Sequence, residues 1–293
     1  MEVNNQGLVI KKVANDFWVK YNNDVVVCKP RGSHKFNGIY VGDYVEFSFE
    51  KGSYLIEKVL ERKNILIRPP LANLEQLIIV ISPVPKPDFF VVDKLILFAY
   101  CYGIEPILIV NKQDLSNELN DYVTNVYSHF IKTIFLSAKT SEGVNELYEV
   151  LSNKISAFAG QSAVGKSALI NSLFKFEGAK EGVLSEKINR GKNTTRHCEI
   201  YFNNDIMIAD TAGFSSLDET LLPIAYYELP YYYPDFNVYK SQCKYTSCVH
   251  YKEPSADCKI KSLVNNKTID KERYLRYRKI YEILQEKWVR THG

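Results

Sequence analysis

The octapeptide GQSAVGKS at positions 160–167 has the spacing G-x-x-x-x-G-K-[ST] of a phosphate-binding loop. It follows an apolar run that predicts a buried strand and precedes a run that predicts a helix, which is the setting this motif requires. Gly160 and Gly165 let successive N–H groups turn toward phosphate oxygens without Cβ clashes. Lys166 supplies a positive charge, and the Ser167 hydroxyl can bind Mg²⁺. The sequence therefore predicts a site for the phosphates of a nucleotide.

A second motif, NKQD at positions 111–114, follows a predicted strand and has residue types that select guanine. The Asp114 carboxylate can accept both the ring N–H and the exocyclic amine of guanine, a pair of donors that adenine lacks. Asn111 would fix the base and the nearby loops, and the stem of Lys112 would lie over the ring. Further along the chain, the strand end FLSAK would complete the base pocket through the backbones of Ser137, Ala138 and Lys139.

A third motif, DTAGF at positions 210–214, ends another predicted strand. Asp210 would meet Mg²⁺ directly or through water, and the Gly213 N–H would touch the γ-phosphate. In the polar stretch KINRGKNTTRH before it, Thr194 or Thr195 would close over Mg²⁺ as part of a switch loop. We assign the binding of magnesium to Ser167, Thr195 and Asp210. We assign catalysis to Lys166, Thr195 and Gly213.

The order of these motifs is unusual, because the guanine motif precedes the phosphate loop. A parallel sheet brings the loops at the carboxyl ends of its strands to one edge, whichever strand comes first. Joining the original ends of a G domain and opening the chain elsewhere gives the order found here. The sequence therefore predicts a circularly permuted P-loop G domain with a mainly parallel sheet. We expect strands at 74–82, 105–111, 132–138, 155–160 and 205–210, and helices at 88–102, 116–129 and 141–154.

Three of the six cysteines and one histidine form the pattern C-x4-C-x-H-x7-C, made by Cys243, Cys248, His250 and Cys258. Three thiolates and one imidazole are a closed tetrahedral donor set, which is typical of structural zinc. Because no coordination position is left open, such a zinc ion would stabilise a small domain and not catalyse. Chance clustering and redox chemistry are the weaker alternatives.

The two ends of the chain differ in charge from its centre. Residues 1–68 carry 11 Lys and Arg against 8 Asp and Glu, and residues 229–293 carry 13 against 7, whereas residues 69–228 carry 13 against 19. Basic ends favour a polyanionic partner, although solvated lysines without a partner would give the same pattern. Short β-rich runs at 1–68 predict a small barrel, either an OB-fold or an SH3-like barrel.

We therefore expect a multidomain α/β protein with three parts. These are an N-terminal β-barrel domain at 1–68, the permuted GTPase domain at 69–225, and a zinc-binding helical domain at 226–293. In the last domain, a helix at about 268–289 would bring Tyr277, Ile280, Tyr281, Leu284 and Trp288 to one side. We expect this stripe to pack against its own domain, and a face that binds a partner is the weaker alternative.

The composition, 46% hydrophobic and 24% charged, is that of a soluble globular protein. The most apolar stretch, at 89–110, contains Asp93, Lys94 and Glu105 and predicts a helix followed by a strand instead of a membrane span. The N-terminus has no apolar core of a signal peptide. We expect a cytoplasmic monomer with no membrane partner.

Taken together, the motifs NKQD, SAKTSEGV, GQSAVGKS, GKNTTRH and DTAGFSSL and the cluster CKYTSCVHYKEP resemble those of the small ribosomal subunit biogenesis GTPases. The similarity runs from ERKNILIRPP at 61–70 to RYLRYRKIYE at 273–282. It implies an OB-fold barrel, one structural Zn²⁺, and hydrolysis of GTP to GDP on the small (30S) ribosomal subunit and its rRNA late in maturation. It also implies GTP contacts from Asn111, Lys112, Gln113, Asp114, Gly160, Gln161, Ser162, Ala163, Val164, Gly165, Lys166, Ser167 and Ala168.

Two positions bear on the rate of hydrolysis. Phe214 follows DxxG, where Ras-type proteins have a glutamine that orients the attacking water. Asn193 stands where the resembled family usually has a histidine before the switch threonines. We therefore expect slow GTP hydrolysis by the protein alone and faster hydrolysis with a partner. We assign no residue to the role of orienting the attacking water. The alternatives are an RNA-binding scaffold in which GTP mainly orders the fold, and a nucleotide kinase, which the guanine motif disfavours.

Overall fold

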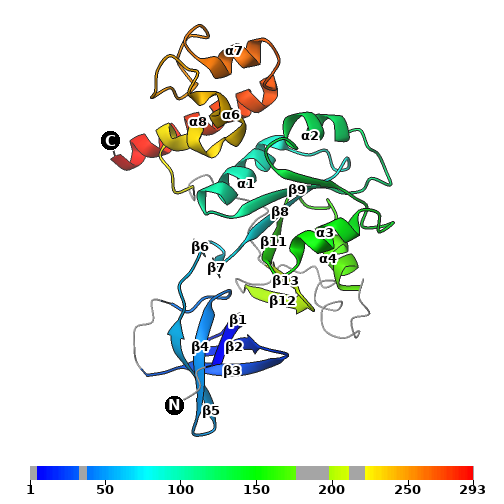
Figure 1. Ribbon diagram of the computed structural model, residues 1–293, viewed down its shortest axis with the longest axis vertical. Coiled ribbons are helices and arrows are strands. Elements are labelled where there is room, and N and C mark those ends of the chain that lie inside the picture. The colour runs from blue at the N-terminus through cyan, green and yellow to red at the C-terminus, as the bar shows by residue number, and fades with distance from the viewer. Residues whose placement is uncertain (1–4, 33–37, 176–197, 211–221, 293) are drawn as a thin grey trace.

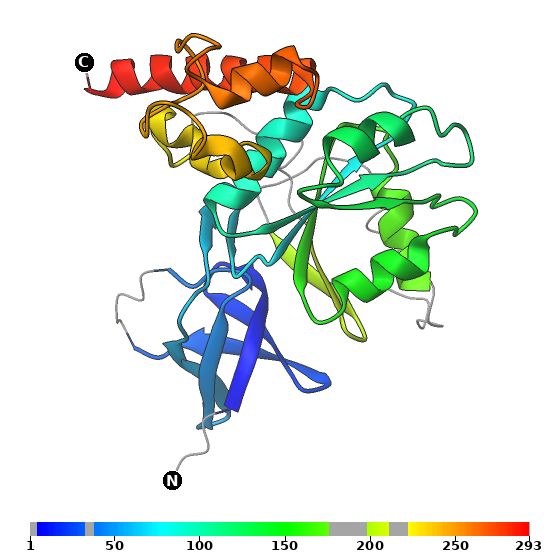
Figure 2. The ribbon, with the colours of Figure 1, turned by 45° about the horizontal axis from the view of Figure 1, so that its top comes forward.

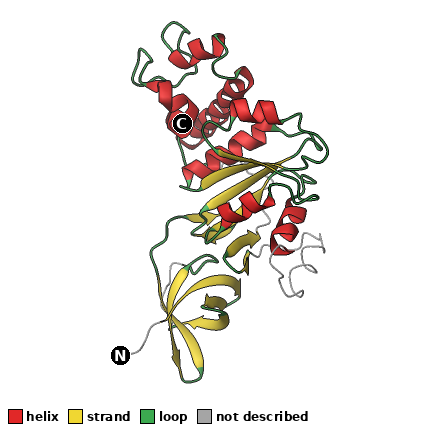
Figure 3. Ribbon diagram, turned by 45° about the vertical axis from the view of Figure 1, so that its right-hand side comes forward, coloured by secondary structure: helices red, strands yellow, loops and turns green. Residues whose placement is uncertain are grey.

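The computed structural model describes residues 5–32, 38–175, 198–210 and 222–292, arranged in three parts along the long axis of the molecule (Figure 1). A β-barrel forms one end, a sheet flanked by helices forms the centre, and a group of helices forms the other end. Figure 3 shows that the helices of the C-terminal part lie at the end of the molecule opposite to the barrel. The predicted fold class is confirmed.

The barrel consists of five strands, namely β1 (Asn5–Val13), β2 (Asp16–Tyr21), β3 (Asp24–Pro30), β4 (Tyr44–Glu50) and β5 (Ser53–Val59). The strands pair in the order β1-β2-β3-β5-β4, with β3 and β5 parallel, and β4 also pairs with β1. The alternation of apolar and polar residues places Phe17, Val19, Val45 and Phe47 in the barrel core. The closed five-stranded barrel is OB-like, one of the two predicted types.

The central sheet has the order β10-β9-β8-β11-β13-β12. Its strands are β8 (Gln76–Ile81), β9 (Glu105–Val110), β10 (Lys132–Phe135), β11 (Ile155–Ala159), β12 (Glu199–Asn203) and β13 (Ile206–Asp210). The five predicted strands are parallel, and β12, which the sequence did not predict, is antiparallel. β12 also pairs with β1 of the barrel through Lys11 and Glu199, so the two sheets are continuous.

Helices cover both faces of the central sheet. They are α1 (Phe89–Cys101), α2 (Asn120–Val126), α3 (Val144–Leu151) and α4 (Lys166–Lys175). Alternation along β8 sends Leu77 and Ile79 toward the core that α1 and α2 share, and Ile78 and Val80 toward the core of α3 and α4. The Asp88 side chain caps α1 by accepting from the Phe90 N–H. This helix and β9 account for the apolar stretch 89–110, as predicted.

No helix in the described parts of the chain combines the length and the apolar composition that a membrane crossing needs.

A short hairpin connects the barrel to the central sheet. It consists of β6 (Ile65–Ile67) and β7 (Pro70–Ala72), and neither strand was predicted. The buried Asn73 side chain donates to the Gly42 carbonyl at 2.8 Å and accepts from the Lys63 N–H at 2.8 Å. Asn73 therefore ties the connection to the barrel. The proposed boundary between residues 68 and 69 falls within this hairpin and stays a prediction.

The C-terminal part consists of a 3₁₀-helix η2 (Tyr226–Tyr232) and the helices α6 (Pro234–Lys240), α7 (Lys259–Asn265) and α8 (Lys271–His292). In α8, the predicted apolar stripe of Tyr277, Ile280, Tyr281 and Leu284 is buried. Trp288 continues the stripe and meets Tyr226 and Tyr227 edge-on. The stripe therefore packs against its own domain, as the spacing predicts. Figure 2 shows α8 running across the end of α1.

A buried ionic network joins the C-terminal part to the central sheet. Arg273 on α8 is 3% exposed and donates to Asp93 on α1 at 2.7 Å and to Asp235 on α6 at 2.6 Å. Asp93 also accepts from Arg276 at 2.5 Å and from the Tyr127 hydroxyl at 2.8 Å. The Asp93 carboxylate therefore binds three side-chain groups, two on α8 and one in the turn after α2, and Arg273 extends the network to Asp235 on α6.

We expect Asp93→Asn to lower the free energy of unfolding by about 3–5 kcal/mol, because it leaves the Arg276 charge and part of the Arg273 charge buried without a counter-charge. Urea unfolding, followed by circular dichroism, measures this change. Glu286→Gln is the control, since Glu286 forms an exposed pair with Arg290 and its removal should cost about 0.5 kcal/mol or less. Equal losses in the two variants would contradict the role of the network.

Candidate nucleotide and metal sites

One side-chain amide connects the three loops that the sequence assigns to the nucleotide. Asn111, which follows β9 and is 1% exposed, donates from Nδ2 to the Val164 carbonyl at 2.9 Å. Its Oδ1 accepts from the Ala138 N–H at 3.1 Å. The guanine motif, the phosphate loop and the loop after β10 are therefore in direct contact at one edge of the sheet.

Lys112 makes a second connection between the guanine motif and the phosphate loop. Its Nζ donates to the Ala163 carbonyl at 2.7 Å and to the Val84 carbonyl at 2.5 Å. Because these bonds hold the end of the side chain, its aliphatic stem spans the gap between the two motifs. This position agrees with a stem that lies over a bound base, which stays a prediction.

Two glycines of the phosphate loop have conformations and neighbours that exclude a side chain. Gly160 has φ +128°, and a Cβ there would lie 2.2 Å from the Val80 carbonyl oxygen. Gly165 has φ +98°, and a Cβ there would lie 2.3 Å from Asn111 Nδ2. The glycines therefore permit the close approach of the phosphate loop to β8 and to the guanine motif.

Lys166 begins α4, and its side chain folds back into the phosphate loop. Its Nζ donates to the Gly160 carbonyl at 2.7 Å and to the Gln161 carbonyl at 2.6 Å. Burial lowers the pKa of Lys166 from its ordinary value. The ammonium thus lies among backbone carbonyls near the N-terminus of a ten-residue helix, where an anion would be favoured. Ser167 and Ala168 follow in the first turn of this helix.

The side chain of Ser137 positions Asp114, a role that the sequence did not predict. The Ser137 hydroxyl donates to Asp114 Oδ1 at 2.6 Å, and this bond is the main cause that lowers the pKa of Asp114. The Ser137 oxygen also accepts from the N–H groups of Lys139 and Thr140 at 3.3 and 3.2 Å. Ser137 therefore acts through its hydroxyl, in addition to the backbone contacts that the sequence predicted for residues 137–139.

The segment between β8 and α1 also borders this site, and the sequence did not assign it. Besides the contact from Lys112 to Val84, the Asp88 N–H donates to Gln161 Oε1 of the phosphate loop at 3.1 Å. The sheet order could have indicated this segment, because β8 lies between β9 and β11 and its carboxyl end must reach the same edge.

Part of the predicted catalytic centre lies outside the described residues. These positions are Thr194, Thr195 and Gly213, and Asn193 and Phe214, which bear on the expected rate, also lie outside them. Asp210, the last residue of β13, is described, and its strand runs parallel to β11, which leads into the phosphate loop. The predicted magnesium residues Asp210 and Ser167 therefore belong to neighbouring strand ends, and their roles stay predictions.

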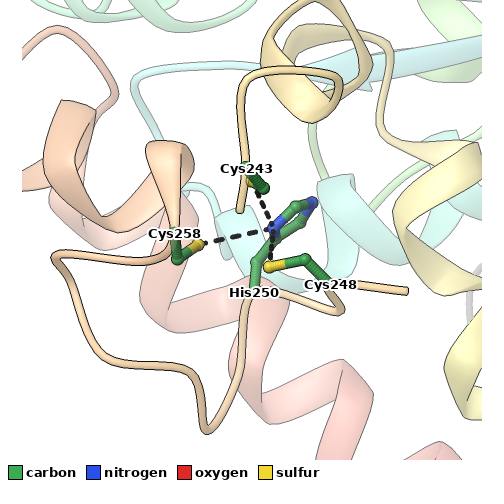
Figure 4. A group of neighbouring side chains, drawn as sticks. All are labelled: Cys243, Cys248, His250 and Cys258. Atoms are coloured by element: carbon green, nitrogen blue, oxygen red, sulfur yellow. Dashed lines mark hydrogen bonds between the residues drawn. The ribbon is translucent and has the colours of Figure 1, made fainter. Parts of the chain in front are cut away.

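The predicted metal ligands are gathered in the C-terminal part (Figure 4). His250 Nδ1 lies 3.2 Å from the sulfur of Cys248, 3.5 Å from that of Cys258 and 3.8 Å from that of Cys243. All four ligand atoms lie within 4.8 Å of one another. A tetrahedral zinc ion with ordinary bond lengths would separate nitrogen and sulfur by about 3.6 Å, so the residues fit this ion.

Burial and hydrogen bonds prepare the cluster for a cation. Burial lowers the pKa of His250 to about 4, so its imidazole is neutral and can offer a lone pair. Burial raises the pKa of the Cys258 thiol, so a nearby cation is needed to hold it as a thiolate. The Glu253 carboxylate accepts from the N–H groups of Val249 and Tyr251, both at 2.8 Å, and thereby shapes the turn that carries His250. The sequence did not indicate this role of Glu253.

We expect Gly165→Ala to weaken GTP binding at least tenfold, because the added methyl group must displace Asn111 and with it the guanine motif. Gly103→Ala is the matched control: Gly103 also has a positive φ, +65°, but a Cβ there meets nothing within 4 Å. Both positions have a positive φ, so the control includes the cost of placing alanine in a left-handed backbone but not the contact with Asn111. Calorimetric titration with a non-hydrolysable GTP analogue measures it, and equal affinities would refute the claim.

Comparison with known proteins agrees with this geometry. The model of the RsgA GTPase family matches residues 59–220. A small ribosomal subunit biogenesis GTPase RsgA from Clostridium acetobutylicum is 40% identical over 275 residues, which are 92% of this chain and 94% of that relative. One from Caldanaerobacter subterraneus is 36% identical over an alignment of 296 positions, which covers 98% of this chain and 98% of that relative.

Two solved structures share the whole architecture. YjeQ from Thermotoga maritima superposes with a TM-score of 0.81 at 32% identity, covering 96% of this chain and 99% of that one. YloQ, described as a circularly permuted GTPase, has a TM-score of 0.80 at 27% identity, covering 97% of this chain and 96% of that one. The predicted permutation is confirmed. The chain belongs to the RsgA GTPase family and is a GTP-hydrolysing enzyme.

Proposed function

We propose that this GTPase binds the small (30S) ribosomal subunit late in its maturation and hydrolyses GTP to GDP there, with turnover that the subunit stimulates. The names of the relatives at 34–40% identity support the ribosomal role. The observation that supports GTP as the ligand is the contact of Asn111 and Lys112 with the phosphate loop. With the two motifs joined in this way, Asp114 would grip the guanine and Lys166 the phosphates of the same molecule.

The roles of the chain's own groups follow from this pose. Asp114, held ionised by Ser137, would accept both donors of the guanine edge. Lys166 would exchange the carbonyls of Gly160 and Gln161 for phosphate oxygens, and the N–H groups of residues 160–168 would surround the phosphates. A bound Mg²⁺, held by Ser167, Thr195 and Asp210, would neutralise charge on the phosphates. Gly213 would contact the γ-phosphate through its N–H.

The two outer parts would contact rRNA. Both have more basic than acidic side chains, with 11 against 8 at 1–68 and 13 against 7 at 229–293, whereas the GTP-binding centre is acidic. Contacts with RNA phosphates predict that binding to the subunit weakens as salt rises. In this proposal the protein acts as a monomer in the cytoplasm, and one Zn²⁺ on Cys243, Cys248, His250 and Cys258 keeps the C-terminal part folded.

We expect GTP hydrolysis to be slow for the protein alone and at least tenfold faster with small ribosomal subunits. The physical reason is that no glutamine follows DxxG, since Phe214 stands there, so a partner must order the groups around the attacking water. Phosphate release, measured with and without subunits, tests this expectation, with large subunits as the control. Binding without any turnover would favour a scaffold in which GTP only orders the fold. Fast turnover without a partner would refute the stimulation.

We expect one zinc ion per chain, lost in Cys248→Ser together with the folded C-terminal part, because a hydroxyl is a much weaker zinc ligand than a thiolate. Zinc is measured by atomic absorption, and folding by the near-ultraviolet circular dichroism of the C-terminal tyrosines. Cys28→Ser is the matched control, since Cys28 is also a buried thiol but lies in the barrel core. Loss of zinc from both variants, or from neither, would contradict the assignment.

A further inference from the structure

A pocket of about 450 Å³ lies between the C-terminal half of α8 and the segment 222–228. We call it the α8 pocket. Its walls include Tyr227 on η2 and Lys287, Trp288, Thr291 and His292 on α8. It lies in the C-terminal part, away from the nucleotide loops and the metal ligands described above. Its volume is in the range of sites that bind small molecules or single groups of a larger ligand.

Aromatic rings form one side of the α8 pocket. The Trp288 ring lies 5.6 Å from the Tyr227 ring, edge-on, and 3.8 Å from the His292 ring in a stacked arrangement. Tyr227 is 47% exposed, although it is a large aromatic residue next to a tryptophan. Such exposed rings at the mouth of a pocket offer a flat face on which a planar group can stack.

The charged groups in the wall of the α8 pocket are Lys287, which is cationic, and Glu228, which is acidic. Lys287 brings an ammonium group to the wall, where its Nζ donates to the Leu222 carbonyl at 2.8 Å. The carboxylate of Glu228 accepts from the Ala225 N–H at 2.7 Å and so takes part in the local fold of the wall. His292 adds an imidazole ring to the wall of the pocket.

The aromatic and basic character continues along η2 beyond the pocket. Tyr231, four residues after Tyr227 in η2, is 62% exposed, and the Lys240 ammonium lies 3.2 Å from the centre of its ring. Asn237 on the same helix as Lys240 donates to the Tyr231 carbonyl at 2.7 Å, so η2 and α6 present these groups together. Alternating aromatic and cationic side chains are the pattern that single-stranded nucleic acid requires.

We propose that the α8 pocket takes one unpaired base of a single-stranded RNA segment, stacked on Tyr227 with its edge toward Trp288, and with its backbone running past Lys287 and toward Lys240. This inference rests on the proposed function, because it names the RNA structure that the C-terminal part would recognise on the subunit. A double helix keeps its bases stacked inside and cannot place one in a pocket, so the site selects unpaired segments. The alternative ligand is a segment of another protein. The lysines beside the aromatic rings, Lys287 and Lys240, favour RNA as the ligand instead.

The test uses Trp288 as a local reporter. Trp288 is one of two tryptophans, and Trp18→Phe in the full-length, zinc-loaded chain makes it the sole one. Titration with a single-stranded oligoribonucleotide should quench the fluorescence of Trp288 in a saturable manner, and a duplex of the same sequence should not. Adding Tyr227→Ala should weaken the affinity about tenfold, since one stacking partner is lost.

Tyr245→Ala is the matched control, because Tyr245 is 46% exposed in the same part of the chain and does not line the α8 pocket. An unchanged Trp288 signal with single-stranded RNA, equal quenching by the duplex, or equal effects of Tyr227→Ala and Tyr245→Ala would each overturn the proposal. Quenching by ribosomal proteins and not by RNA would assign the pocket to a protein.

The same variants separate this proposal from the proposed function. Subunit-stimulated GTP hydrolysis is measured alongside the titration for the Trp18→Phe chain. If stimulation is present and Trp288 does not respond to RNA, the pocket proposal is wrong and the ribosomal role stands. If Trp288 responds and no stimulation is found, the pocket binds RNA and the proposed function is wrong.

Discussion

The three loops that the sequence assigns to the nucleotide are held together by one buried amide, that of Asn111. Its two hydrogen bonds, to Val164 and Ala138, hold together three loops that come from different strands and from distant parts of the chain. An amide is suited to this position because it offers a donor and an acceptor in one rigid plane. Gly165 completes the arrangement, since any side chain there would occupy the place of the Asn111 nitrogen. The loops can therefore converge in any chain order, which is why a permuted chain still forms the site.

The sheet and the C-terminal part are held together by charge as well as by apolar packing. Asp93 lies on α1, directly after the segment that contacts Lys112 and Gln161, and it binds two arginines of α8. A short path of contacts thus leads from the nucleotide loops to the helix that supports the metal cluster. Because a buried ion pair tolerates little displacement, this contact fixes the angle between α1 and α8.

The sequence predicted those features of the fold that are encoded within a few neighbouring residues. The spacing of GQSAVGKS, the apolar runs and the Cys/His cluster each encode a loop, a strand or a donor set within a few residues, and the family model and solved relatives confirm the fold built on them. β12 escaped prediction because, within it, Ile200 alone is fully buried, and one of its two partner strands, β1, lies far away in the sequence. The Ser137 hydroxyl, the Val84 carbonyl and the Asp93–Arg273 pair act across long sequence separations, and nothing in their neighbourhood in the chain marks them.

The pairing of β12 with β1 has a consequence for the solution behaviour of the protein. An unpaired outer strand presents a row of free N–H and C=O groups, which invites other chains to add to the sheet. Here β1 of the barrel pairs with the start of β12, at Lys11 and Glu199, and the pairing of β1 with β4 closes the barrel itself. A fragment that lacks about the first sixty residues would expose the edge of β12, and we expect it to self-associate. The barrel therefore also protects the protein from aggregation.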